Sequence, residues 1–308
     1  MHNYVKGYIY ASITAILWGL LAIALKVSLS DLTAADITWF RFFNAFTYLS
    51  AYYLIRKPQY LRILRKPPLL LIVAAVSLAV NYYGFVKGVE LTSPSIAQIF
   101  IQLGPVLLAV SGILFFKEKV NWKQIVGFIL VLTGLTVFYN EQFHTVFNGA
   151  GKWQGGVNWV ILAAICWTLY SILIKVLVTK YPPMQLNLVI FGLPAIIFLP
   201  FVNFGHFLDL SLVNWLILLF LGLNTLFAYG LLSMALQCIE ANKVSIIIVF
   251  NPILTFIIMA ILAITDAKWI EHEYYTFITI IGAAVVLSGG LLAVIKKRVR
   301  NNRNLFKE

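Results

Sequence analysis

Apolar runs of about 20 residues recur along the whole chain, and this pattern constrains the fold more than any other feature of the sequence. A run of that length is what an α-helix needs to cross a hydrocarbon layer about 30 Å thick. The 308 residues are 61% hydrophobic and 11% charged, which excludes a water-soluble single domain. The sequence therefore predicts an all-α integral membrane protein.

Ten such segments are predicted, separated by prolines and polar turns. They cover residues 7–29, 34–55, 67–88, 93–116, 121–139, 157–179, 184–204, 212–237, 242–264 and 274–295. A polar, glycine-containing connector at 141–156 divides the chain near its middle. We therefore expect two five-helix units, at 1–140 and at 157–308, the second ending in a basic tail.

Lys and Arg residues are distributed unevenly over the alternate loops. Seventeen of the 23 fall on one side of the predicted bundle and three on the other, with three inside the segments. Because positively charged loops are retained in the cytoplasm, both termini are expected to be cytoplasmic. The net charge of +12 is explained by these loops and does not indicate binding to nucleic acid. No glycine-rich nucleotide loop, cofactor site or metal site is predicted, and the two cysteines lie in apolar segments.

The two halves of the chain match at corresponding positions. Offsets of 149 and 147 residues relate the pairs Trp18 and Trp167, Lys26 and Lys175, Tyr82 and Tyr229, Pro105 and Pro252, and Trp122 and Trp269. Five segments are an odd number, so the second copy must enter the membrane in the opposite orientation. Inverted repeats of this kind are typical of transporters that alternate access to a site near the midplane.

The most specific pattern runs from the fourth to the fifth segment. It comprises the small residues Thr92 to Ser95, the Gly104-Pro105 break, the acidic Glu118, and then Gln124, Gly127 and Gly134. With these motifs, the sequence resembles the EamA family of the drug/metabolite transporter superfamily over nearly its whole length. The second half keeps Asn251-Pro252 and Gly289, with Asp266 near the place of Glu118. The resemblance implies ten helices, transport of small organic metabolites, and residence in a bacterial inner membrane.

Polar and aromatic side chains inside the segments are the candidates for binding substrate, because an ionisable group at the bilayer centre costs about 2.5–3.5 kcal/mol. The candidates are Trp18, Arg41, Tyr82, Gln98, Gln102, Trp167, Tyr170, Lys175, Asn224 and Tyr229. Each class has a structural alternative. Lys175 can extend its amine to the membrane surface, Arg41 can pair with an acidic residue such as Asp36, and the amides and rings can simply pack against neighbouring helices.

Two further groups are singled out for conformational roles. Pro105 and Pro252 are predicted helix breaks, and Gln102 or a substrate is expected to bond to the carbonyl that Pro105 leaves free. Glu90 and Glu240, near the ends of the third and eighth segments, are candidates for proton coupling, with helix capping as the alternative.

These features predict a secondary transporter rather than an enzyme. Interior cations indicate a substrate that carries a carboxylate or phosphate, with amino acids or related metabolites as the first choice and export as the direction. One alternative is a polytopic membrane enzyme acting on lipid-linked substrates, which needs clustered acidic residues or histidines at one interface. The other is a passive channel, which needs a ring of like charges or a filter loop.

Overall fold

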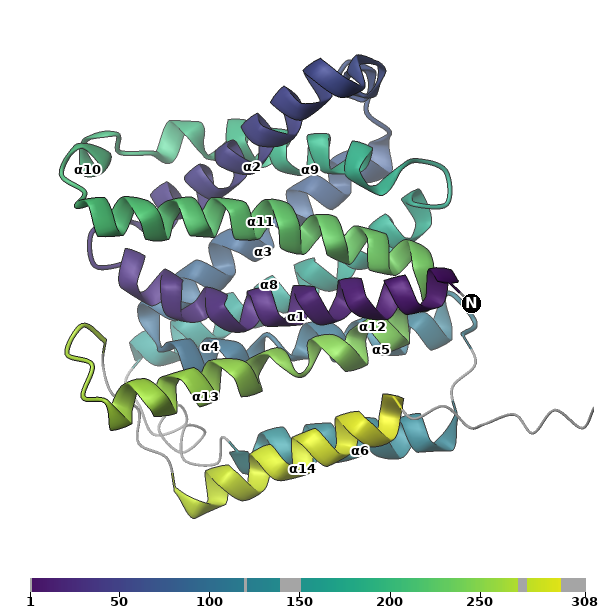
Figure 1. Ribbon diagram of the computed structural model, residues 1–308, viewed down its shortest axis with the longest axis vertical. Coiled ribbons are helices and arrows are strands. Elements are labelled where there is room, and N and C mark those ends of the chain that lie inside the picture. Colours follow the sequence, from purple (N-terminus) through teal and green to yellow (C-terminus); the bar gives the residue numbers. More distant parts are fainter. Residues whose placement is uncertain (1, 119–120, 139–150, 271–275, 295–308) are drawn as a thin grey trace, which may run out of the picture.

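The computed structural model describes residues 2–118, 121–138, 151–270 and 276–294, and all regular structure in these ranges is helical (Figure 1). Each predicted segment contains helix. The long helices are α1 (His2–Ser28), α2 (Ala34–Arg56), α3 (Leu69–Leu91), α4 (Pro94–Phe100), α5 (Leu103–Leu114), α6 (Trp122–Phe138), α8 (Gly151–Leu177), α9 (Pro183–Phe198), α11 (Leu212–Cys238), α12 (Ala241–Ile248), α13 (Asn251–Ile264) and α14 (Phe277–Val294). Short helices η1 (Pro58–Leu64), η2 (Leu199–Phe201) and α10 (Gly205–Leu208) lie in the connections.

Seven stretches of the described helices are long and apolar enough to cross a membrane. They lie in α1, α3, α4 with α5, α8, α9 with η2, α11, and α12 with α13. Helix α2 has the necessary length but contains Asp36, Arg41 and Asn44, and α6 contributes only the shorter apolar stretch Ile125–Gly134. The chain is therefore an integral membrane protein, as its composition predicts.

Two helix boundaries differ from those expected. Helix α8 begins at Gly151, within the predicted connector, and its Gly156 approaches the end of α3 closely. A Cβ atom there would lie 2.9 Å from the Cβ of Leu91 and 2.6 Å from a methyl of Thr92. Helix α9 ends at Phe198, before 204, and passes into the short helix η2, which contains Pro200. Pro200 has no N–H to bond to the carbonyl four residues earlier. Residues 141–150 of the connector and the basic tail from 295 onward lie outside the described residues.

The fourth and ninth segments are each divided into two helices just ahead of a proline. Pro105 has no N–H, so it cannot bond to the carbonyl of Ile101 four residues earlier, and α4 ends there. That carbonyl is not left for Gln102, as the sequence suggested. It accepts the N–H of Gly104 at 2.9 Å in a tighter turn. In the second half, α12 ends at Ile248, four residues before Pro252, as α4 ends at Phe100, five residues before Pro105.

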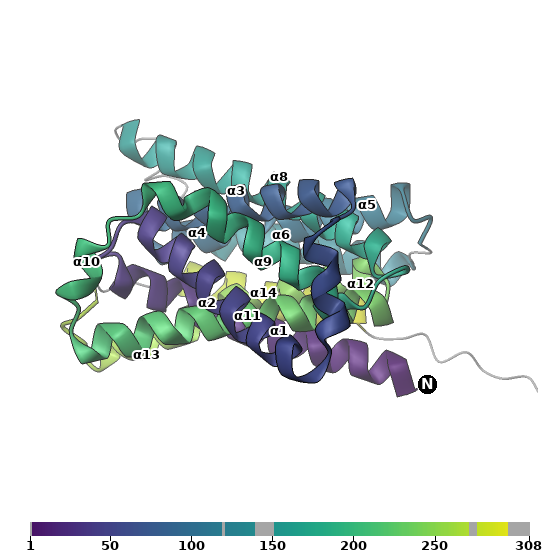
Figure 2. The same cartoon turned by 90° about the horizontal axis from the view of Figure 1, so that it is seen from above.

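Corresponding helices of the two halves make corresponding contacts, where α1, α2, α3 and α5 correspond to α8, α9, α11 and α13. The contact of α3 with α8 matches that of α11 with α1. In the same way, α5 with α8 matches α13 with α1, and α3 with α9 matches α11 with α2. Figures 1 and 2 show α2 slanting across α9 and α11, against which it packs. Helices α6 and α14 pack on each other at one edge of the bundle (Figure 1).

Candidate substrate cavity

A cavity lies between helices of both halves of the chain. Its lining residues are Trp18 and Leu21 of α1, Arg41 of α2, Asn81, Tyr82 and Phe85 of α3, Gln98 of α4, Ile101 and Gln102 of the α4–α5 break, Pro105 of α5, Trp167 of α8, Tyr229 of α11, Ile248 of α12 and Asn251 of α13. The cavity volume is about 50 Å³, so the cavity is narrow. Seven of the ten predicted binding residues line it.

Aromatic rings form one wall of this cavity. Trp18 meets Trp167 edge-on with 5.9 Å between ring centroids, and its ring lies 5.2 Å from that of Tyr229. Tyr82 also lies 5.2 Å from Tyr229, and Tyr170 packs behind Tyr229 at 5.7 Å. The repeat relates Trp18 to Trp167 and Tyr82 to Tyr229, so equivalent positions of the two halves meet here. Such a wall accommodates an apolar group or a cation above the ring faces.

Arg41 places a positive charge at the edge of the aromatic wall. Its side chain is 2% exposed, its Nε–H donates to Oγ1 of Thr225 at 3.1 Å, and its guanidinium carbon lies 4.2 Å from the ring centroid of Tyr82. No carboxylate in the described part of the chain forms an ion pair with it. Nothing in the sequence singles out Thr225, which follows Asn224 within a run of apolar residues.

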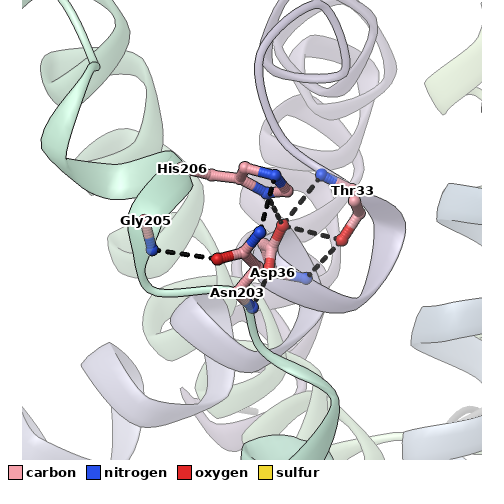
Figure 3. Close-up of polar contacts among 5 residues, drawn as sticks. All are labelled: Thr33, Asp36, Asn203, Gly205 and His206. Atoms are coloured by element: carbon pink, nitrogen blue, oxygen red, sulfur yellow. Dashed lines mark hydrogen bonds and ion pairs between the residues drawn. The ribbon is translucent and has the colours of Figure 1, made fainter.

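The alternative partner for Arg41, Asp36, is engaged elsewhere (Figure 3). Its buried carboxylate accepts from the backbone N–H of Thr33 at 3.0 Å, the Thr33 hydroxyl at 2.7 Å and the backbone N–H of Asn203 at 2.9 Å, and it lies 2.8 Å from Nδ1 of His206. These bonds fix the first turn of α2 to the connection between α9 and α11. They thereby position Arg41, five residues further along the same helix.

Several polar atoms in the cavity have no partner. Gln98 donates to the Trp18 carbonyl at 3.3 Å, and Gln102 donates to Oδ1 of Asn251 at 3.1 Å. The Oε1 atoms of both glutamines and the Trp18 indole N–H are buried without a hydrogen bond. Because buried polar groups are nearly always paired, these atoms are available to a ligand. Together with Arg41 they offer donors for an anionic group and acceptors for an ammonium or hydroxyl group.

Three predicted binding residues lie away from the cavity. Tyr170 is fully buried behind the aromatic wall. The Asn224 amide donates to the carbonyl of Leu17 at 2.7 Å, which joins α11 to α1. Lys175, at the end of α8, donates to two backbone carbonyls beyond the cavity and not to a ligand site.

The proposed coupling carboxylates lie at helix ends and pair locally. Glu90 forms an ion pair with Lys87 at 2.9 Å. Glu240 pairs with Lys243 and accepts from the Tyr4 hydroxyl at 3.0 Å. Neither lines the cavity. Across the described ranges, no group of three or more His, Cys, Asp or Glu residues could hold a metal ion.

Two cavity amides were missed by reasoning from the sequence. Asn81 donates to the Ala163 carbonyl at 2.9 Å and accepts from the Tyr229 hydroxyl at 3.4 Å. Asn251 accepts from Gln102, as described above. Both directly precede residues that the repeat had marked, namely Tyr82 and Pro252, so adjacency was the available signal.

Comparisons with known proteins agree with this architecture. The sequence model of the EamA-like transporter family matches residues 5–140 and 154–295. An uncharacterized transporter of Haemophilus influenzae is 31% identical over 300 residues, covering 97% of both chains. The uncharacterized inner membrane transporter YhbE of Escherichia coli K12 is 32% identical over 297 residues, covering 95% of this chain and 92% of YhbE. A crystal structure of another protein shares the fold, with a TM-score of 0.74 at 17% identity over 94% of this chain and 98% of that one. The chain belongs to the EamA-like transporter family.

Proposed function

We propose that this membrane transporter is a secondary carrier of small anionic or zwitterionic metabolites, with amino acids first, and that it exports them by alternating access. Ten membrane-crossing segments in two inverted five-helix units carry this mechanism, with the cavity at their interface. The observation that carries the proposal is Arg41, a buried cation that lines the cavity without an acidic partner in the described residues. A carboxylate or phosphate would supply the missing negative charge.

The inverted repeat is supported by contacts between individual positions. The Thr14 hydroxyl donates to the carbonyl of Ala228 at 3.2 Å, and the Asn81 amide donates to the carbonyl of Ala163 at 2.9 Å. The repeat offsets carry Thr14 onto Ala163 and Asn81 onto Ala228. The same two repeat positions are therefore joined twice. In one case they lie on α1 and α11, and in the other on the corresponding helices α8 and α3. Matched helix contacts and two matches to one family model point the same way.

The orientation and location rest on separate support. Four basic residues lie at the end of α2 and in and beside η1: Arg56, Lys57, Arg62 and Arg65. They belong to the side of the bundle that carries seventeen Lys and Arg residues, the side we assign to the cytoplasm together with both termini. A relative is named as an inner membrane transporter, and we assign this chain to the same membrane.

The test is counterflow of labelled substrate in proteoliposomes. Purified protein is reconstituted, loaded in turn with amino acids, dicarboxylates, phosphorylated metabolites and neutral sugars, and assayed for saturable exchange. We expect saturable exchange with members of the first three groups. The Arg41→Gln variant should lose it, because a guanidinium–carboxylate bond is removed, whereas Arg41→Lys should retain part of it.

Two results would contradict the proposal. Folded protein that exchanges no compound in the panel would remove the support for a carrier. Equal exchange by Arg41→Gln and the unaltered protein would show that the buried guanidinium does not bind substrate.

A further inference from the structure

The turn between α11 and α12 is held by charged side chains from two other helices. Lys175 of α8 donates to the carbonyls of Leu236 and Ile239 at 2.7 and 2.6 Å, where α11 ends. Glu118, which follows α5, accepts the backbone N–H groups of Ala241 and Asn242 at 2.8 and 3.0 Å, where α12 begins. Each charge opposes the helix dipole it faces, since a cation lies at a helix C-terminus and an anion at an N-terminus.

The bond made by Glu118 joins the two halves of the chain across the contact of α5 with α12. Gly112 of α5 makes room for it, because a Cβ atom at that position would lie 2.6 Å from Oε2 of Glu118 and 3.4 Å from the backbone N of Asn242. Both carboxylate oxygens therefore accept hydrogen bonds from α12 only while α5 stays close to that helix. Separating the two helices breaks both hydrogen bonds.

The opposite end of the bundle has a different arrangement. Lys117 and Asp266 share the unusual left-handed backbone, with φ of 51° and 50°, and they are 149 residues apart. Glu118 follows Lys117 directly, so Asp266 lies near the place of Glu118, as the sequence indicated. The N-terminus of α4, which corresponds to that of α12, is bonded by its own Ser93, whose Oγ accepts the N–H of Ile96 at 3.3 Å. At the Glu118 end, the N-terminus of the corresponding helix α12 is instead bonded by a carboxylate from the other half of the chain.

We propose that Glu118 locks this end of the transporter closed, and that its release from α12 is required before the cavity can open toward the side we assign to the cytoplasm. Lys175 supports the lock by holding the preceding turn. This inference rests on the proposed alternating access, and it assigns Glu118 a positioning role, because its carboxylate does not line the cavity. While both bonds are formed, α5 and α12 stay together at this end.

The lock can be tested without a substrate, by measuring how fast a buried cysteine is alkylated. Ser245 is fully buried on α12, so Ser245→Cys in a background lacking Cys166 and Cys238 reports whether the helices around α12 separate. A water-soluble maleimide is applied to the cytoplasmic face of inside-out vesicles. We expect Glu118→Gln to raise the labelling rate about ten-fold, which corresponds to a shift of about 1.4 kcal/mol in the opening equilibrium. Ser28→Cys, buried at the end of α1 on the opposite side, should not be labelled faster.

Matched variants separate a lock from a general loss of structure. Gly112→Ala keeps the carboxylate but displaces it, so labelling at Ser245→Cys should also rise. Glu240→Gln alters a carboxylate in the same turn that makes no bond to the α12 amides, and labelling should stay unchanged. If Glu118→Gln does not accumulate in the membrane, Glu118→Asp, which is shorter by one methylene, provides the comparison.

The outcomes distinguish the lock from the proposed function. Faster labelling in vesicles from protein that exchanges no compound would support the lock while the transport proposal fails. Unchanged labelling in folded Glu118→Gln and Gly112→Ala protein would overturn the lock, whatever the transport assay shows.

Discussion

The hydrogen bond between Arg41 and Thr225 gives the sharpest test of how the cavity is built. Thr225→Val replaces the hydroxyl by a methyl group of the same shape, so packing is retained while two bonds are removed: the acceptor for Nε–H of Arg41, and the hydroxyl's own bond to the Leu221 carbonyl at 3.0 Å. The comparison with Arg41→Met separates the first from the second. Arg41 is 2% exposed, which leaves little water to substitute for the lost oxygen. If the bond positions the guanidinium, its removal affects both stability and substrate affinity.

The expected magnitude follows from the charge and the burial of the donor. Hydrogen bonds between transmembrane helices average about 0.6 kcal/mol in double-mutant cycles and reach about 1.7 kcal/mol. Bonds to charged groups contribute about 1.5–3 kcal/mol in proteins generally. Because Arg41 is charged and almost completely buried, we expect a coupling energy of about 1.5 kcal/mol between Arg41 and Thr225, near the top of the membrane range.

The assay is the free energy of unfolding in mixed micelles, measured for Thr225→Val, Arg41→Met and the double variant. Methionine keeps the apolar stem of Arg41 and provides no donor. Thr225→Val should lower the unfolding free energy by about 1.5 kcal/mol in the unaltered protein and by less than about 0.5 kcal/mol beside Arg41→Met. Effects that add within about 0.3 kcal/mol would refute the assignment, since independent residues behave that way.

Three other predictions address packing, the α2 anchor and the cavity wall. Gly134→Ala places a Cβ atom 2.7 Å from the backbone N of Val286 on α14, and it should lower the unfolding free energy by about 1–3 kcal/mol. Gly155→Ala, where a Cβ atom would have nothing within 4 Å, should not lower it. Equal losses for the two variants would contradict the close contact. Asp36→Asn replaces one acceptor oxygen of the buried carboxylate in Figure 3 by an NH2 group, which leaves a buried polar group without its partner. It should cost about 2 kcal/mol in unfolding free energy, against less than about 0.5 kcal/mol for the exposed Asp209→Asn. Trp18→Phe removes an unpaired indole N–H, so the unfolding free energy should hardly change while substrate affinity falls about ten-fold. Unchanged affinity would exclude that N–H as a donor to the ligand.

Much of the helical framework could be predicted from local properties of the sequence. Apolar length predicted where helices form along the chain, because a helix in lipid must satisfy its own backbone bonds over a fixed thickness. Seven stretches of the described helices are long and apolar enough to cross a membrane. Pro105 and Pro252 marked the divided helices, because a missing N–H acts on the carbonyl four residues earlier wherever the helix lies. The positions of Trp18, Trp167, Tyr82 and Tyr229 in the repeat also indicated the residues that meet at the cavity.

Contacts between distant residues could not be predicted in this way. The sequence contains equally plausible partners for each buried polar group, and which face of a helix meets which neighbour depends on how all the helices pack. Tertiary structure alone paired Arg41 with Thr225 and not with Asp36, and it directed Lys175 to the end of α11 instead of the cavity. It alone seated Glu118 on α12. Apolar length and backbone chemistry act within a segment and can be read along the chain, whereas a hydrogen bond between segments exists only once packing has brought its two atoms within about 3 Å of each other.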